Sequence, residues 1–151
     1  MAALSTAQVA LGLSTDQLVI LTPVQANGLS AAQWGALSTY QVAALNPHLI
    51  PLLLPDQIKS GFTSSQIAVL TTDEIASLTT DQIAQGLTTS HIAGLTTRQV
   101  ASLTTDQIVA LTTSQIVALE TRDIVALQTE QVAAISTVQF YEFSTSQILS
   151  L

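Results

Sequence analysis

The sequence predicts an all-α solenoid: a single domain over residues 1–151 in which 18 very short helices follow one another, one for each repeat of eight or nine residues. Three observations carry this prediction. An octapeptide repeat runs through nearly the whole chain, each unit holds the residues that begin a helix, and three of the four prolines fall at the first helical position of a unit. Because stacked repeats of this kind contact mainly their neighbours along the chain, the array predicts a solenoid.

The repeat has the consensus L-[ST]-T-x-Q-[IV]-[AV]-[AS] and accounts for residues 4–150. Fifteen units have eight residues, and the three that end at Gly12, Gly61 and Gly86 have nine. Numbered from 1 to 18, the units begin at Leu4, Leu13, Leu21, Leu29, Leu37, Leu45, Leu53, Phe62, Leu70, Leu78, Leu87, Leu95, Leu103, Leu111, Leu119, Leu127, Ile135 and Phe143. Position 5 is Gln in 14 units, and position 6 is Ile or Val in 14. The array leaves no room for a linker.

Positions 2 and 5 of the repeat together form the start signal of a helix. A Ser or Thr N-cap accepts a hydrogen bond from the backbone N–H three residues later, and a Gln there reaches back to the N-cap N–H, which is the capping box. The apolar residues at positions 1 and 6 then form a hydrophobic staple across the cap. Pro23, Pro47 and Pro55 fall at position 3, the first helical residue, where a missing N–H is tolerated. These signals predict a helix over about positions 3 to 8 of each unit.

Some units depart from the simple pattern, and each departure carries an expectation. We expect the extra glycine of each nine-residue unit to follow its helix in a left-handed conformation. Pro51 falls inside the helix of unit 6 and should distort it, because proline lacks the N–H that a helix needs. Helices this short are unstable alone in water, so the units must stack. We expect positions 1 and 6, with small residues at position 7 or 8, to face the core.

Other periodic folds fit the repeat less well. One continuous helix would rotate its apolar stripe by about 80° per unit, and a coiled coil needs heptads rather than octads. A parallel β-solenoid stays as the alternative, because Thr, Ile and Val favour strands. Against it, Ala, Leu and Gln favour helices, and prolines at position 3 fit poorly in a buried ladder of strands.

The composition excludes several classes of function. Charged residues make up 9% of the chain, apolar residues 48%, and the formal net charge is -7. Nucleic-acid binding needs clustered Lys and Arg, whereas the chain has only Lys59, Arg98 and Arg122, so we expect no nucleic-acid partner. No apolar run reaches the roughly 18 residues of a transmembrane helix, so we expect no membrane insertion. The absence of cysteine removes disulfides and thiolate chemistry.

Residues suited to catalysis or metal binding form no recognisable motif. His48 and His91 lie in different units without the spacing of a metal site, and His91 replaces the position-5 Gln, where it can serve the same capping role. Aspartates at position 4 complement the helix dipole, but they skip units too irregularly for a calcium ladder. We therefore expect no enzyme activity, no cofactor and no metal. Ice binding by the regular Thr array is a third hypothesis, which the variable position 4 disfavours.

Candidate assembly or partner contacts lie first where the chain departs from the consensus. The stretch LNPHLIPLLLPDQIKSG, residues 45–61, is rich in apolar residues and prolines. We expect an apolar contact patch there from Leu49, Ile50, Leu52, Leu53 and Leu54. Tyr141 occupies a position that is small in most other units, which makes it a further candidate for a surface or subunit contact.

The two ends of the array supply the remaining candidates. Natural solenoids usually carry polar capping repeats, whereas the first unit, LSTAQVALG, and the last, FSTSQILS, are close to the consensus. Leu4 opens the first unit, and Leu151 is the opening residue of one further unit. We expect either a piece of a longer array or copies that stack end to end as a homo-oligomer, which yields open filaments unless a ring closes.

The octads LTTRQVAS, LTTDQIVA and LTTSQIVA, residues 95–118, resemble arrays found in large bacterial surface or secreted proteins of the adhesion type. The resemblance covers nearly the whole chain and implies a structural role outside the cell or at the bacterial cell surface. It carries no haem-binding residues over to His48 or His91. The expected function is a non-enzymatic rigid stalk, spacer or self-assembling filament subunit. The alternative is an adhesive module that presents its exposed repeat face, or residues 45–61, to a protein partner.

Overall fold

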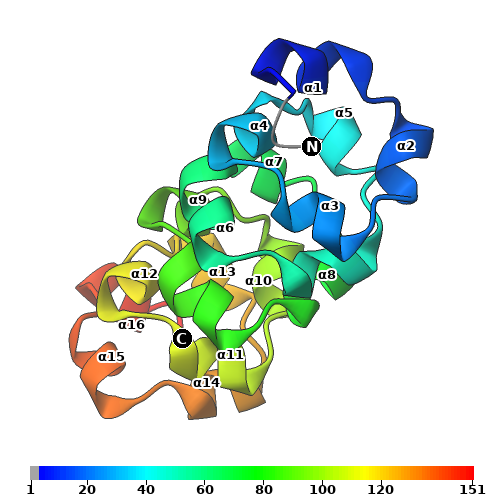
Figure 1. Ribbon diagram of the computed structural model, residues 1–151. Helices are drawn as coiled ribbons and strands as arrows, with labels where there is room; N and C mark the ends of the chain where they lie inside the picture. The colour runs from blue at the N-terminus through cyan, green and yellow to red at the C-terminus, as the bar shows by residue number, and fades with distance from the viewer. Residues whose placement is uncertain (1–3) are drawn as a thin grey trace.

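The computed structural model describes residues 4–151 and shows an elongated rod of short helices (Figure 1). These residues form eighteen helices of four to seven residues and no strand, so the helical prediction is confirmed and the β-solenoid alternative is wrong. The helices are α1 (Thr6–Gly12), α2 (Thr15–Val19), α3 (Pro23–Asn27), α4 (Ala31–Ala36), α5 (Thr39–Val42), η1 (Pro47–Leu52), α6 (Pro55–Gly61), α7 (Ser64–Ile67), α8 (Thr72–Ser77), η2 (Gln82–Gly86), α9 (Thr89–Ala93), α10 (Thr97–Ala101), α11 (Thr105–Ala110), α12 (Thr113–Val117), α13 (Thr121–Val125), α14 (Thr129–Ala134), α15 (Thr137–Tyr141) and α16 (Thr145–Ile148). Each helix corresponds to one unit of the repeat.

The start of each helix is fixed by the predicted hydrogen bonds. In α11, the Thr104 hydroxyl accepts a hydrogen bond from the Gln107 backbone N–H at 3.2 Å, and the Gln107 side-chain oxygen accepts one from the Thr104 N–H at 2.9 Å. The same reciprocal pair forms in the other units that carry Ser or Thr at position 2. Leu54, Glu120 and Gln128 cannot supply the hydroxyl, so α6, α13 and α14 keep only the bond from the N-cap N–H.

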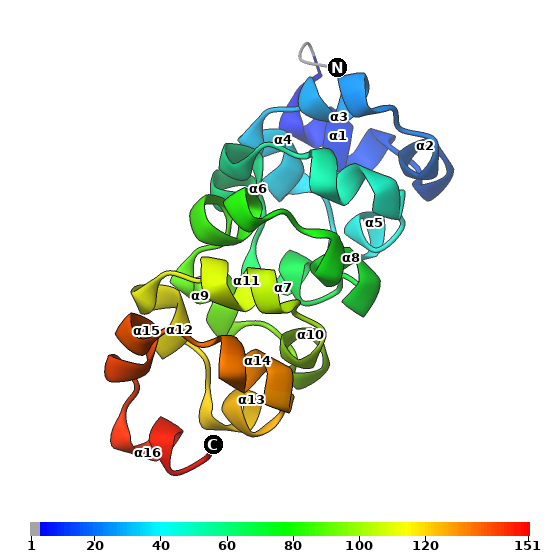
Figure 2. The same cartoon turned by 90° about the horizontal axis from the view of Figure 1, so that it is seen from below.

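Three units make one turn of the solenoid. Helices three units apart pack on one another along the rod, so the helices stack in three columns (Figures 1 and 2). The first column holds α1, α4, α6, η2, α11 and α14, the second holds α2, α5, α7, α9, α12 and α15, and the third holds α3, η1, α8, α10, α13 and α16. A unit therefore rests on a segment of chain about 24 residues away rather than on its neighbours in sequence.

The core runs along the rod between the three columns. Side chains at positions 1 and 6 form it, as predicted, and Leu103 and Ile108 are typical buried members. Trp34 fills position 6 of unit 4 and stacks on Phe62, with the ring centroids 5.4 Å apart. Small residues at position 8, such as Ala110, pack partly against this core. The valines at position 7 are exposed in α11, α12 and α13, so position 7 does not face inward there.

All three nine-residue units lie in the first column, and the structure corrects the expected role of their glycines. Gly12, Gly61 and Gly86 end helical segments, and no glycine in the part of the chain that the structure describes has a positive φ. The extra residue lengthens α1 and α6 to seven residues and gives η2 its π-helical turn. A Cβ added at Gly61 would lie 2.9 Å from the Ala31 carbonyl oxygen of α4. At Gly61, close packing rather than left-handed geometry requires glycine.

Unit 6 forms the 3-10 helix η1 instead of an α-helix, as the position of Pro51 predicts. Pro51 cannot donate the backbone hydrogen bond of an α-helix at that point, and the tighter helix results. The Asn46 side chain caps the segment by accepting a hydrogen bond from the His48 N–H at 3.1 Å. Because η1 still packs between α3 and α8, the distortion stays local.

Candidate functional site

The position-5 glutamine has a structural role beyond capping. While the Gln107 side-chain oxygen accepts from the N-cap of α11, its Nε2 donates to the carbonyl oxygens of Ile75 at 2.9 Å and Leu78 at 2.7 Å. Both carbonyls belong to the preceding turn of the solenoid: Ile75 lies in the last turn of α8, and Leu78 directly follows the helix. The last carbonyls of a helix have no partner inside it. One carboxamide therefore caps the start of its own helix and the end of a helix one turn earlier.

This arrangement repeats along the rod, and we name it the glutamine ladder. The side chains whose Nε2 donates to carbonyls 28–32 residues earlier are Gln33, Gln41, Gln57, Gln66, Gln82, Gln99, Gln107, Gln115, Gln131, Gln139 and Gln147. All of them are buried. Buried hydrogen bonds are strong, and leaving one unmade is costly. The ladder therefore ties each turn to the next.

Sequence reasoning assigned these glutamines only the capping role and missed the ladder. A signal for it was present in the composition of position 5. Capping boxes accept Glu as well as Gln, yet position 5 is Gln in 14 units and Glu in only one. Glu can accept a hydrogen bond from the N-cap but has no N–H to donate. The strong preference for Gln therefore indicates a second partner that accepts hydrogen bonds.

His91 replaces the glutamine of unit 11 and keeps both hydrogen bonds. Its Nδ1 lies 3.2 Å from the Thr88 backbone nitrogen, and its Nε2 lies 2.8 Å from the Phe62 carbonyl oxygen. Because Nδ1 must accept and Nε2 must donate, these partners assign the neutral ring with its proton on Nε2. Burial lowers the pKa of His91 from its usual 6.5, against a smaller opposing contribution from the Phe62 carbonyl. The predicted capping role is confirmed.

Asp123 interrupts the ladder in unit 15. Its carboxyl group is fully buried and accepts hydrogen bonds from the Glu120 N–H at 3.3 Å and from the Thr97 hydroxyl at 3.2 Å. Burial raises the pKa of this carboxyl group, although both hydrogen bonds oppose the shift. A carboxylate has no N–H, so no side chain among the described residues donates to the carbonyls of Ile92 and Leu95. Most of their counterparts in other turns receive such a bond, as Ile67 and Leu70 do from Gln99.

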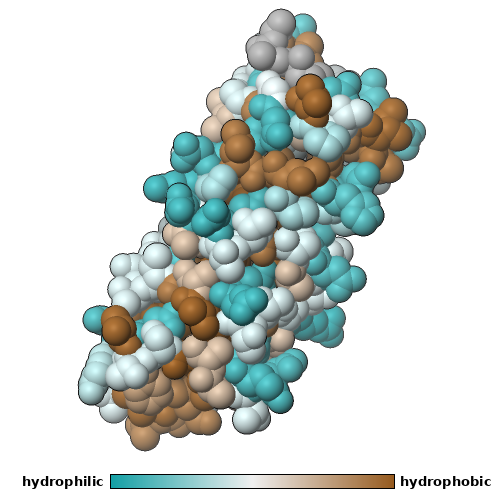
Figure 3. Space-filling model, turned by 60° about the horizontal axis from the view of Figure 1, so that its bottom comes forward, coloured by the Kyte–Doolittle hydropathy of each residue, from teal (hydrophilic) through white to brown (hydrophobic). Residues whose placement is uncertain are grey.

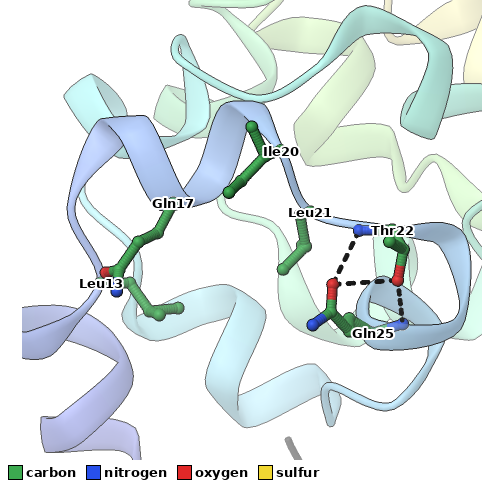
Figure 4. Close-up of a pocket in the computed structure, with 6 residues that line it drawn as sticks. All are labelled: Leu13, Gln17, Ile20, Leu21, Thr22 and Gln25. Atoms are coloured by element: carbon green, nitrogen blue, oxygen red, sulfur yellow. Dashed lines mark hydrogen bonds between the residues drawn. The ribbon is translucent and has the colours of Figure 1, made fainter.

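At the N-terminal end of the rod the ladder stops with free donors. Gln8, Gln17 and Gln25 cap their own helices, but their Nε2 groups have no acceptor among residues 4–151. Gln17 and Gln25 line a pocket of about 440 Å³. The pocket is lined by Leu13, Gln17, Ile20, Leu21, Thr22 and Gln25 (Figure 4). The side-chain oxygen of Gln25 is held by the Thr22 N–H at 2.9 Å, so its Nε2 is the group left to bind a partner.

At the C-terminal end the ladder stops with free acceptors. The backbone carbonyls of Leu127, Ile135 and Phe143 accept no hydrogen bond from any residue that the structure describes. One turn earlier, the equivalent carbonyl of Leu111 accepts a hydrogen bond from Nε2 of Gln139 at 2.7 Å. The last turn therefore presents the three position-1 carbonyls through which the turns of units 7–9 and 13–15 are each held by the turn that follows.

The position-6 side chains of this last turn are also uncovered. Phe140 is 42% exposed and Ile148 44%, whereas Ile108 and Ile116, at the same position of earlier turns, are fully buried. Figure 3 shows apolar surface gathered at this lower end of the molecule. Inside the rod, the unit three places later covers position 6, and the last turn has no such unit. Both ends thus combine apolar surface with unpaired hydrogen-bonding groups, which are side-chain amides at the N-terminal end and backbone carbonyls at the C-terminal end.

The structure divides the predicted patch of residues 45–61 between core and surface. Leu49 and Ile50 are 2% and 1% exposed, so they belong to the core, and the expectation that they form a contact surface is wrong. Leu53, at position 1 of unit 7, is buried as well, so its place in the patch is also wrong. Ile50 and Leu53 hold the staple positions 6 and 1, whereas Leu49 holds position 5, which is buried in most other units. Leu52 and Leu54 are exposed and stay as candidate contacts.

The other predicted contacts lie near the ends. Tyr141, in α15, and Leu151 are exposed in the C-terminal turn, whereas Leu4 packs partly against the core in the N-terminal turn. A single copy does not bring them together, because the two turns lie at opposite ends of the rod (Figure 2). That the ends are contact regions stays a prediction, and sequence reasoning did not point to the glutamines and carbonyls that lie there.

The fold and the ladder define the class of protein: an α-helical solenoid of octapeptide repeats. A family model described as the ALTTAQ repeat matches residues 85–113 and 116–151, in the C-terminal half of the chain. Its motif is close to ALTTSQ, residues 110–115, which contains the Thr N-cap and the ladder glutamine of unit 14. Comparison with curated proteins and with solved structures gave no match.

Two further features of residues 4–151 concern membranes and metals. No helix in this range is long and apolar enough to cross a membrane. No three acidic, histidine or cysteine side chains in the range gather closely enough to hold a metal ion. Among the described residues, one regular set of hydrogen-bonding groups lacks partners. It consists of the glutamine amides at the N-terminal end and the backbone carbonyls at the C-terminal end.

Proposed function

We propose that this chain is a non-enzymatic structural protein, a rigid stalk or spacer of a bacterial surface or extracellular structure. The glutamine ladder carries the proposal, because it couples each turn to the next through buried hydrogen bonds in addition to the apolar core. A rod built this way keeps its two ends at a fixed separation, which is what a spacer needs. The resemblance of the octads to arrays of surface proteins supports the location.

A spacer should lengthen in steps of one turn. Duplicating residues 95–118, three complete units, inserts one turn in register with the columns that follow. Small-angle X-ray scattering of the dilute protein should show a rod about one sixth longer with an unchanged cross-section, since 18 units become 21. A Gly/Ser insert of equal length is the control and should broaden the distance distribution instead. A flexible-chain profile for the natural sequence would contradict the proposal.

An adhesive or protein-binding module is the second candidate, and the exposed pair Leu52 and Leu54 favours it. The double variant Leu52→Ser/Leu54→Ser removes apolar surface at the start of α6 without touching the ladder. If this function is correct, fluorescently labelled variant protein should lose its binding to cell surfaces while its scattering profile stays unchanged. Unchanged binding would remove this pair as the adhesive site.

A further inference from the structure

We infer that Glu74 and two backbone carbonyls of the preceding turn, those of Val42 and Leu45, form a binding site for a calcium ion. The site joins units 5, 6 and 9, in the interior of the solenoid. Each position-5 side chain is one rung of the glutamine ladder, and the ion takes the place of the amide that this rung lacks. The inference goes beyond the proposed stalk or spacer and does not depend on it.

The rungs that have no side-chain N–H lie in a single column. Within units 4–18 they are Leu49, Glu74 and Asp123, which belong to η1, α8 and α13 of the third column. Leu49 has no polar side-chain atom. Both carboxyl oxygens of Asp123 accept hydrogen bonds, one from the Thr97 hydroxyl and the other from the Glu120 N–H. Neither of these two rungs offers an unused oxygen.

The two carboxyl oxygens of Glu74 have different surroundings. Oε2 accepts hydrogen bonds from the Thr71 N–H at 2.7 Å and from the Thr71 hydroxyl at 2.9 Å. Oε1 has no hydrogen-bond or ion-pair partner among residues 4–151, although Glu74 is only 3% exposed. A buried carboxylate without a partner is costly, so Oε1 is the atom left to bind a ligand.

Gln99, at the same position of the next unit in the third column, shows where Oε1 of Glu74 points. The side-chain oxygen of Gln99 accepts hydrogen bonds from the N–H and the hydroxyl of its own N-cap at 2.8 and 3.0 Å, as Oε2 of Glu74 does. Its Nε2 then lies 2.9 Å from the Ile67 carbonyl oxygen and 2.8 Å from that of Leu70. Oε1 of Glu74 occupies the place of this Nε2 and faces the equivalent pair of carbonyls.

The equivalent carbonyls for Glu74, which lie 32 and 29 residues earlier, are those of Val42 and Leu45. Val42 ends α5, and its carbonyl oxygen accepts a hydrogen bond from the Leu45 N–H at 3.0 Å. The Leu45 carbonyl oxygen accepts none from any residue that the structure describes. Carbonyls at the end of a helix carry partial negative charge, so three electron-rich oxygens converge here without a donor between them.

Three converging oxygens with one negative charge suit a calcium ion. Calcium binds carboxylate and backbone carbonyl oxygens in flexible geometry, and water completes its coordination sphere. Water can reach Oε1 of Glu74, because Trp34 Nε1 is the unpartnered side-chain atom among the described residues that is sealed from solvent. No three acidic, histidine or cysteine side chains gather among residues 4–151, but this site takes two of its three protein ligands from the backbone. With one carboxylate we expect weak binding, with a dissociation constant of about 1 mM.

Thermal unfolding tests the site when calcium chloride is added while sodium chloride keeps the ionic strength constant. At about 10 mM calcium the natural chain should unfold about 4 °C higher than in a chelator. Glu74→Gln restores the amide of the consensus, so it should fold and show no calcium-dependent shift. The control Asp106→Asn removes the same charge from an exposed position of α11 and should keep the full shift.

Nuclear magnetic resonance then locates the ion. The carbonyl carbons of Val42 and Leu45 and the carboxyl carbon of Glu74 should shift together as calcium is added, with one common midpoint. A natural chain without a calcium-dependent rise in unfolding temperature would overturn the inference. So would a rise that Glu74→Gln retains, or calcium-induced shifts confined to exposed carboxylates.

Discussion

Gln107 and Gln25 stand at the same position of the same motif, yet the structure gives them different surroundings. Both side-chain oxygens accept a hydrogen bond from their own N-cap at 2.9 Å. Gln107 also donates to two carbonyls of the preceding turn and is 2% exposed, whereas Gln25 has no such acceptor and lies open at the end of the rod. The stability of a unit therefore depends on the turn before it, as expected for helices too short to persist alone.

The largest expected effect that separates the two regions comes from Gln107→Glu. The substituted carboxylate would face the carbonyl oxygens of Ile75 and Leu78 without an N–H to donate, and such a buried charge costs about 3 kcal/mol or more. The matched variant Gln25→Glu should change the free energy of unfolding by less than about 0.5 kcal/mol. Urea unfolding followed by circular dichroism measures both, and equal effects would show that the ladder adds nothing to stability.

A second pair of variants separates interior packing from the open end. Gly61→Ala should cost about 2 kcal/mol, because the added Cβ would lie 2.9 Å from the Ala31 carbonyl oxygen and 3.0 Å from Cβ of Trp34. Gly12→Ala meets nothing within 4 Å and should instead stabilise the protein by about 0.5 kcal/mol, since alanine favours helix over glycine. Thermal unfolding compares the two. A Gly61→Ala variant as stable as the natural chain would contradict the close packing of α4 on α6.

A smaller effect comes from restoring an interrupted rung with Asp123→Gln. The new amide could donate to the carbonyls of Ile92 and Leu95 and should raise the free energy of unfolding at neutral pH by about 1 kcal/mol. Because the folded-state pKa of Asp123 is raised from 3.8, its own contribution is most favourable below pH 3.8 and is lost as the pH rises through the folded-state pKa. The gain should therefore shrink in acid. A stability gain from Asp123→Gln that grew at acidic pH would contradict the raised folded-state pKa of Asp123.

Glu74 offers a check on the same reasoning, because it is the natural Glu at position 5. Its carboxyl oxygen accepts hydrogen bonds from the Thr71 N–H at 2.7 Å and from the Thr71 hydroxyl at 2.9 Å, so the capping half of its role is intact. The array therefore holds carboxylates at position 5 in two units, at Glu74 and at Asp123. Glu74→Gln, measured beside Asp123→Gln, should be stabilising for the same reason.

The smallest expected effect is the pH dependence that His91 introduces. Its folded-state pKa is lowered from 6.5, so its contribution to stability is complete above pH 6.5 and is lost as the pH falls toward the folded-state pKa. Protonation would place a hydrogen on Nδ1, which then could not accept from the Thr88 N–H. His91→Gln should flatten the fall in stability between neutral and mildly acidic pH. Identical pH profiles for the two proteins would show that the pKa of His91 is the same in the folded and unfolded states, which would contradict the lowered folded-state pKa.

The parts of the fold that follow from local chemistry could be predicted from the sequence. The N-cap, the reciprocal Gln and the staple lie within one unit, so they located all eighteen helices, and Pro51 marked the distorted one. The glycine role was wrong because Gly61 is selected by α4, which lies a full turn away in the first column. Leu49 and Ile50 were assigned to a surface patch because their unit departs from the consensus, although Ile50 holds staple position 6 and Leu49 holds position 5.

The candidate site was harder to predict for the same reason. The acceptors of Gln107 lie 29 to 32 residues away, and the number of units per turn decides which carbonyls it can reach. The sequence of one octapeptide does not determine the number of units per turn. Only the preference for Gln over Glu at position 5 carried information about the ladder, and it identified the missing donor without identifying the partner.

Hydrogen exchange of the glutamine side-chain amides tests the ladder most directly. Nuclear magnetic resonance of isotope-labelled protein, diluted until copies are separate, can follow each carboxamide. We expect slow exchange for buried amides such as Gln107 and Gln115, and fast exchange for Gln8, Gln17 and Gln25 at the N-terminal end of the rod. Uniform exchange along the chain would contradict the claim that the position-5 glutamine holds each turn to the one before it.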